Sequence, residues 1–106
     1  MIRGMLEEEM ERLIRHQKLY STKINELPQG SIQLRSIKNG RKYVYLKYRE
    51  GTRVVQKYIG LPDDEDVKNI AAKIELRKKH EQTLKSIKMD IQLIKKALRT
   101  RGSNEE

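Results

Sequence analysis

The stretch from Gly30 to Gly60 constrains the fold most, because two turn signals divide a β-forming sequence into three pieces. Asn39-Gly40 supplies residues that tolerate positive φ, and Glu50-Gly51 supplies a second tight turn. The pieces between them are rich in β-branched and aromatic residues, which suit strands. The expected strands are Ser31–Lys38, Arg41–Arg49 and Thr52–Ile59. The sequence therefore predicts a three-stranded antiparallel meander over residues 31–59.

Turn length decides which side chains share a face of this sheet, because a one-residue change swaps the faces. Two-residue turns would gather Leu34, Tyr43, Tyr45, Val54 and Tyr58 on one face. Three-residue bulged turns would gather Ile32, Leu34, Val44, Leu46 and Val54. We favour the second grouping because it makes the more apolar core. It leaves outward Arg35, Tyr43, Tyr45, Lys47, Arg49, Arg53, Val55 and Lys57.

The same stretch carries most of the chain's formal charge of +9. It holds eight lysines and arginines against one acid, Glu50, and four of the five tyrosines. Residues 1–30 are balanced, with five basic and five acidic side chains, and residues 61–106 nearly so, with eleven and nine. A basic, tyrosine-rich sheet needs an anionic partner, and the phosphate backbone of a nucleic acid is the first candidate.

We expect the strand cations to neutralise phosphates and two tyrosines to pack on sugars or bases. The expected nucleic-acid-binding residues are Arg35, Lys42, Tyr43, Tyr45, Lys47, Arg49, Arg53 and Lys57. A plainer explanation is that a small sheet with exposed edges uses Lys and Arg against aggregation, and Tyr as a strand former. The local concentration of charge favours the nucleic-acid interpretation.

A helix is predicted on each side of the sheet, over residues 2–27 and 63–100. Apolar residues recur at intervals of three and four in both segments. Pro28 ends the first helix, because the residue before a proline is pushed out of the α region. The acids Asp63–Asp66 suit the N-cap and first turn of the second helix. Residues 101–106 are polar and are expected to form a frayed tail.

Both helices are attached to the same sheet, so we expect them to pair antiparallel in a coiled-coil-like hairpin. In the expected register Leu13 lies near Leu84 and Gln17 lies beside His80, so the polar break in each stripe falls in one layer. The predicted fold class is α+β, with residues 1–106 forming a single elongated module. Further apolar positions broaden both stripes and predict a homodimer through the helices. They are Met5, Ile14, Leu19, Met89, Leu93 and Ala97.

The sequence lacks the residues that several other functions need. It has no cysteine, and its two histidines, His16 and His80, have no obvious third partner, so we expect no metal and no cofactor. It has no P-loop, dinucleotide fingerprint or nucleophile motif, so we expect that it is not an enzyme. No apolar run is long enough to span a membrane. An acidic cluster stands where a secretion signal needs apolar residues, which favours a cytoplasmic location.

The middle of the chain resembles a known small architecture. Gly30-Ser31-Ile32 opens the first strand, Tyr58-Ile59-Gly60 closes the third, and an acid-capped helix follows. Residues 30–74 are similar to the arm-type DNA-binding domains of tyrosine recombinases, which lay a three-stranded sheet in the major groove and back it with a helix. Residues 43–51, with Tyr58-Ile59-Gly60, also resemble small uncharacterised bacterial and mobile-element proteins. The long flanking helices depart from the recombinase pattern.

The favoured function is that of a non-enzymatic nucleic-acid-binding protein of phage or mobile-element type, with DNA favoured over RNA. The alternative is a small phage-borne inhibitor or adaptor that binds a nucleic-acid-targeting enzyme or a ribonucleoprotein. A purely structural coiled-coil spacer is disfavoured, because a spacer needs no cluster of positive charge.

Overall fold

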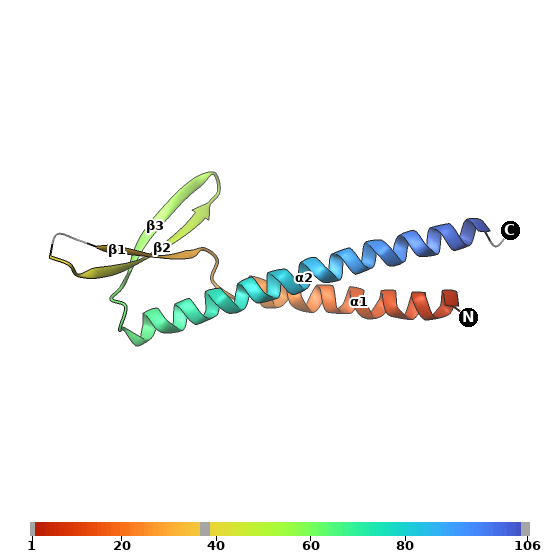
Figure 1. The fold of residues 1–106 in the computed structure, drawn as a ribbon, viewed down its shortest axis with the longest axis horizontal. Coiled ribbons are helices and arrows are strands. Elements are labelled where there is room, and N and C mark those ends of the chain that lie inside the picture. The colour runs from red at the N-terminus through yellow and green to blue at the C-terminus, as the bar shows by residue number, and fades with distance from the viewer. Residues whose placement is uncertain (1, 37–38, 105–106) are drawn as a thin grey trace. The chain divides into compact units, whose positions relative to one another are not determined.

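A computed structural model describes residues 2–36 and 39–104. The elements follow one another as two helices around a sheet, as predicted, and the fold class is α+β (Figure 1). They are α1 (Ile2–Asn25), β1 (Ser31–Ser36), β2 (Lys42–Glu50), β3 (Arg53–Gly60) and α2 (Glu65–Asn104). Within the described residues, no helix is both long and apolar enough to cross a membrane.

The chain forms two compact units, and α2 contributes to both of them. The helical unit consists of residues 1–26 and 79–106, and the sheet unit consists of residues 27–78. Each unit has its own local packing.

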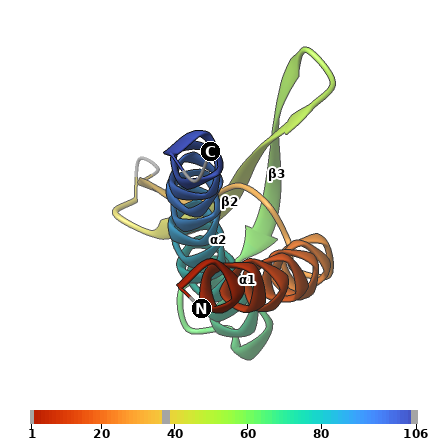
Figure 2. The same ribbon diagram turned by 90° about the vertical axis from the view of Figure 1, so that its right-hand side faces the viewer.

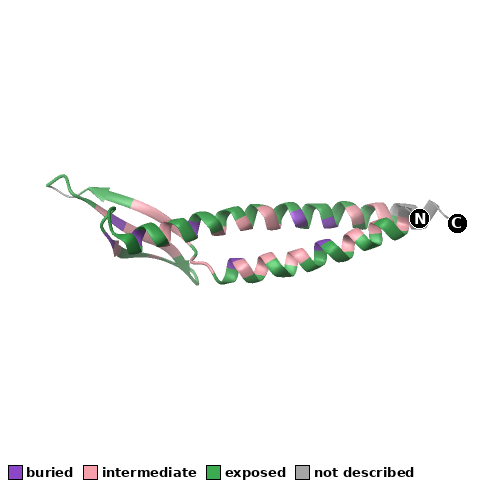
Figure 3. Cartoon of the chain, turned by 90° about the horizontal axis from the view of Figure 1, so that it is seen from below, coloured by how far each residue is buried: buried purple, intermediate pink, exposed green. Residues whose placement is uncertain are grey.

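The helical unit is held together by an apolar seam between α1 and the C-terminal part of α2. Leu13 from α1 is buried in one cluster with Ile87 and Ile91 from α2. Met10, Tyr20 and Ile94 pack against this cluster and are partly buried. Figure 3 shows the buried residues on the sides of the two helices that face each other. The predicted antiparallel helix pair is therefore confirmed, and removal of these side chains from water stabilises it.

The axial register of α1 against α2 differs by about one turn from the expected register. His80 lies edge-on against Tyr20, with ring centroids 5.3 Å apart, and Tyr20 is one turn beyond the expected partner Gln17. At the other end of the unit, Arg3 donates a hydrogen bond of 3.3 Å to the carbonyl of Leu98. The periodicity of each stripe defines a face of its helix but not the axial position of that face. His80 therefore makes an aromatic contact one turn along α1 from Gln17, its expected partner.

Both helix boundaries nearest the sheet are set by local backbone chemistry. The α1 helix ends at Asn25, two residues before the expected end, and the Glu26 amide still donates to the Thr22 carbonyl. The α2 helix begins at Glu65 and runs to Asn104. The predicted tail over 101–106 is therefore wrong as far as Asn104, and residues 105–106 lie outside the described part of the chain.

The sheet is an antiparallel meander with the order β1-β2-β3 (Figures 1 and 2). Its two connections differ in length: one has an odd number of residues and the other an even number. Ser36 pairs with Lys42, so five residues connect β1 to β2, two more than the favoured three-residue turn, and this odd number puts the same side chains on one face. Glu50 pairs with Arg53, so only Gly51 and Thr52 connect β2 to β3. Gly51 has φ of 64°, and a glycine at the first of two central residues is typical of a type II′ hairpin.

The two-residue connection reverses the expected orientation of β3. Val54 pairs with Arg49 and Val55 pairs with Tyr48, so Val55 lies on the apolar face and Val54 does not. The favoured grouping was therefore correct for β1 and β2 but wrong for β3. The physical reason is that one residue fewer in the second turn changes the face of every following side chain until a bulge intervenes. The bulge comes late, where Tyr45 pairs with Tyr58 and Val44 pairs with Gly60.

Gly60 is the point at which the sheet meets the first turns of α2. Its φ of 141° suits glycine alone, and a Cβ there would lie 2.8 Å from the side chain of Val67 and 2.6 Å from a carboxylate oxygen of Asp64. The Asp64 carboxylate accepts a hydrogen bond of 2.9 Å from the Leu61 amide. Val44, opposite Gly60, is 1% exposed. This joint fixes the apolar face of the sheet unit against α2.

Candidate nucleic-acid interface

Strand pairing divides the sheet into two faces, because residues directly opposite in an antiparallel pair point the same way. We call one the tyrosine face. Its residues are Ser31, Gln33, Arg35, Tyr43, Tyr45, Lys47, Arg49, Val54, Gln56 and Tyr58. We call the other the apolar face. Its residues are Ile32, Leu34, Ser36, Lys42, Val44, Leu46, Tyr48, Glu50, Arg53, Val55, Lys57 and Gly60.

The residues expected to bind nucleic acid are divided between these two faces. Five of the eight lie together on the tyrosine face: Arg35, Tyr43, Tyr45, Lys47 and Arg49. The other three, Lys42, Arg53 and Lys57, lie on the apolar face, near its ends or on its edge strand. The three are exposed, but they cannot share one flat ligand with the tyrosine face. The expected outward surface is therefore smaller than the sequence suggested.

Three tyrosine rings form a cluster across β2 and β3. The ring centroids of Tyr45 and Tyr58 lie 5.6 Å apart at 62°, and those of Tyr43 and Tyr58 lie 6.1 Å apart at 54°. Tilted and edge-on contacts of this kind are favourable for aromatic pairs. Tyr58 is the central ring and was absent from the expected binding residues. The alternative with two-residue turns had grouped it with Tyr43 and Tyr45, so the signal was present in the sequence.

Arg35 is held above this cluster from the edge strand β1. The carbon at the centre of its guanidinium lies 5.0 Å from the centroid of the Tyr45 ring, which is a cation–π contact. The same guanidinium donates a hydrogen bond to the side-chain oxygen of Gln56 on β3. The Arg35 side chain therefore crosses over β2 and links both edge strands on the tyrosine face.

A shallow groove of about 460 Å³ continues the tyrosine face towards the other end of β2. Its lining includes five residues of this face: Ser31, Gln33, Lys47, Arg49 and Val54. Gln29 closes one end by donating a hydrogen bond of 3.2 Å to the Arg49 carbonyl. Gly30 fits tightly beneath it, because a Cβ there would lie 2.5 Å from the Lys47 carbonyl oxygen. The groove thus combines two cations with small polar side chains, which suits an anionic ligand.

The tyrosine face offers cations, aromatic rings and amides, which are groups suited to contacts with anions and bases. Among the residues of this face, no nucleophilic side chain lies beside a general base. Within residues 2–36 and 39–104, no group of three or more histidine and carboxylate side chains could hold a metal ion. His80 lies against Tyr20 in the helical unit, so it acts there as a packing residue.

Comparisons with known proteins locate the chain in one family. A family model described as a domain of unknown function, DUF6788, matches residues 6–69. The match covers most of α1, the whole sheet and the first turn of α2. No curated protein and no solved structure gave a match, so the likeness to recombinase arm domains stays a prediction. Because the match covers more than half of the 106 residues, the chain belongs to the DUF6788 family.

Proposed function

We propose that the sheet unit is a non-enzymatic nucleic-acid-binding module that acts in the cytoplasm, with DNA favoured over RNA. The observation that carries this proposal is the gathering of Arg35, Lys47 and Arg49 with three tyrosine rings on one face. Cations neutralise phosphates, and aromatic rings contact sugars and bases. A phage or mobile-element setting follows from the sequence resemblance alone and forms part of the same proposal.

A matched pair of charge reversals tests the proposal. Lys47→Glu with Arg49→Glu removes two cations from the tyrosine face, and Arg53→Glu with Lys57→Glu removes two from the apolar face. Both variants change the net charge of the chain equally. The first should lower affinity for nucleic acid by about 10-fold or more and reduce the slope of log K against log salt by roughly 1.4 to 1.8. The second should lower affinity much less.

Fluorescence anisotropy at low salt with duplex DNA, single-stranded DNA and RNA gives the readout. Equal losses in the two variants would show that net charge, and not the tyrosine face, controls binding. No binding to any of the three probes would refute the proposed function outright. Circular dichroism of each variant checks that its fold is retained.

We also propose that two copies associate through α1. Met5, Ile14 and Leu19 are exposed apolar residues on this helix. When Met5 lies opposite Leu19 of an antiparallel second copy, Glu8 comes next to Arg15 of that copy, so the contact joins opposite charges. Light scattering should give twice the mass of the 12.6 kDa chain, and Leu19→Glu should return the mass of one chain. A single-chain mass for the unaltered protein would refute the dimer.

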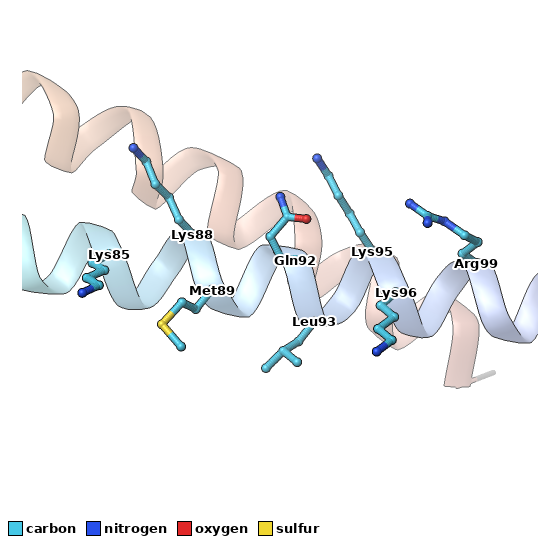
Figure 4. Close-up of a pocket in the computed structure, with 8 residues that line it drawn as sticks. All are labelled: Lys85, Lys88, Met89, Gln92, Leu93, Lys95, Lys96 and Arg99. Carbon is cyan, nitrogen blue, oxygen red and sulfur yellow. The ribbon is translucent and has the colours of Figure 1, made fainter.

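A specific observation favours a second candidate function, binding of an acidic protein surface. Met89 and Leu93 on α2 are 59% and 64% exposed and point the same way between Lys85 and Lys96 (Figure 4). The lining of this shallow groove also includes Lys88, Gln92, Lys95 and Arg99, with no acid among them. Apolar anchors with a cation at each end (Figure 4) complement a carboxylate-bearing target, as an inhibitor or adaptor would need. Nuclease-resistant capture of one protein that is lost in Leu93→Glu would support this function.

A further inference from the structure

We propose that the tyrosine face takes single-stranded nucleic acid in preference to duplex. Tyr58 contacts an unpaired base, while Tyr45 is a positioning residue for Arg35. This inference rests on the proposed function, since it names the form of nucleic acid that the same face binds. It also changes the role of Tyr45, which the sequence alone had placed on the ligand.

The Tyr45 ring already contacts two other side chains of the tyrosine face, which leaves less of the ring for a stacked base. Arg35 lies over it at 5.0 Å, and the Tyr58 ring meets it at 62°. Tyr45 is half-buried, so little of its ring is left for a ligand. What the ring does instead is fix the guanidinium, with Gln56 as the second anchor on β3. Arg35 is thereby held in place before any ligand arrives, which lowers the entropy cost of binding.

Tyr58 is more exposed to solvent than Tyr45, because it lies on the edge strand β3 and is 50% exposed. Tyr43 and Tyr45 both contact its ring, so its orientation is constrained although half of it faces solvent. An unpaired base can stack on a ring presented in this way. In a duplex the base faces are covered by neighbouring base pairs, and the ring would reach only sugars and base edges. The exposed aromatic surface therefore has more to gain from a single strand.

The cations of the tyrosine face follow one path away from the Tyr58 ring, as a strand running across the face requires. The Arg35 guanidinium reaches Gln56, which lies directly opposite Lys47. Lys47 and Arg49 follow Tyr45 on β2, at distances of about 7 Å and 13 Å along the strand for side chains two and four residues away. The groove lined by Ser31 and Gln33 lies beside these two cations and can hold the sugar-phosphate chain. A strand with its base on Tyr58 thus meets Arg35, Lys47 and Arg49 on its way towards the groove, where they can contact its phosphates.

Anisotropy with labelled oligo(dT), oligo(U) and a duplex, each about twelve nucleotides or base pairs long, tests the preference. We expect both single strands to bind about 10-fold or more tightly than the duplex at equal salt. Tyr58→Leu should weaken single-strand binding by about 5- to 100-fold and change duplex binding by less than about twofold. Tyr20→Leu is the matched control, because Tyr20 belongs to the helical unit, where its ring meets His80.

The positioning role of Tyr45 has its own readout. Tyr45→Leu should reduce the salt slope for oligo(dT) by about 0.7, the value for one phosphate contact, and Arg35→Ala should reduce it equally. Tyr45→Phe keeps the ring beneath the guanidinium and should restore the unaltered slope. A Tyr45→Phe variant that binds as poorly as Tyr45→Leu would overturn this role.

The failures of the two proposals are distinguishable. Duplex binding as tight as single-strand binding, or a Tyr58→Leu variant that binds both forms normally, would overturn the single-strand inference and leave the proposed function standing. No binding to any probe would overturn both. Tyr58→Phe keeps the ring and removes only the hydroxyl, so it should keep most of the single-strand affinity. A loss as large as that of Tyr58→Leu would overturn stacking on this ring.

Discussion

The helical unit buries a seam of apolar residues, whereas the sheet unit exposes a face of rings and cations. Leu13, Ile87 and Ile91 are nearly inaccessible in the first. In the second, Val44 is buried beside Gly60, yet Leu34, Val54 and Tyr58 remain at least half exposed. Residues 27–78 hold twelve basic and six acidic side chains, against twelve and nine in the helical unit. The helical unit therefore has a contiguous buried cluster, whereas the sheet unit leaves apolar and aromatic side chains exposed on its strands.

The largest expected effect lies in the seam of the helical unit. Ile87→Ala should lower the free energy of unfolding by about 2–5 kcal/mol, because it removes buried methyl groups and leaves a cavity beside Leu13. Leu93→Ala, at a 64% exposed position of the same helix, should change it by less than about 0.5 kcal/mol. Urea denaturation followed by circular dichroism gives both values. Similar losses in the two variants would mean that the outer face of α2 is covered in solution.

The helical unit was largely predictable because its pattern is local. Spacings of three and four identified the buried stripes, which include Met10 and Leu13 on α1 and Ile87, Ile91 and Ile94 on α2.

 Ile94 packs against the buried cluster of Leu13, Ile87 and Ile91. The axial register was not predictable, because a shift of one turn keeps the same faces in contact. The contact of Tyr20 with His80 shows which axial register the two helices adopt.

The same substitution should have opposite signs in the two units. Gly60→Ala puts a Cβ within 2.6 Å of Asp64 and 2.8 Å of Val67 at a φ of 141°, so it should lower the free energy of unfolding by about 1–3 kcal/mol. Gly4→Ala has nothing within 4 Å of its new Cβ and lies in α1, so it should raise stability by up to about 0.5–1 kcal/mol. Thermal denaturation of both variants measures the difference. Destabilisation of both to the same extent would contradict the distinction.

The sheet unit was less predictable, because its faces depend on turn length and not on a local pattern. Glu50-Gly51 correctly indicated a turn, but the sequence allowed either two or three residues there. The structure uses Gly51 and Thr52, and that single residue moved Arg53 and Lys57 away from Tyr45. The strands were predictable from their residue types, but the set of side chains that share the tyrosine face was not.

A smaller effect should follow from the turn that decides the face of β3. Gly51→Ala places an L-residue at a φ of 64°, where open space surrounds the new Cβ, so only the backbone cost of about 1–2 kcal/mol applies. Gly51→Asn should cost less, because asparagine tolerates this conformation better. Contacts between the Tyr45 and Tyr58 rings, measured by nuclear Overhauser effects, should persist in both variants. Loss of these contacts in Gly51→Asn would show that the pairing of β3 depends on glycine itself.

The smallest expected effect is an acid dependence confined to the helical unit. Two hydrogen bonds from Arg12 lower the pKa of Glu9 below its ordinary value, and Glu9 in turn raises the pKa of Arg12. A carboxyl whose pKa is lower in the folded chain binds fewer protons there than in the unfolded chain. Its contribution to stability is therefore complete above the ordinary value of 4.5 and disappears as the pH falls through the lowered folded pKa.

Glu9→Gln removes this titration while keeping a side chain of similar size. The difference in unfolding midpoint between Glu9→Gln and the unaltered chain should therefore shrink as the pH is lowered from 6 towards 3, and it should be small throughout because the pair is solvent-exposed. Glu8→Gln is the matched control, since the structure pairs Arg12 with Glu9 and not with Glu8. An acid dependence that Glu8→Gln removes and Glu9→Gln does not would show that Arg12 pairs with Glu8 in solution.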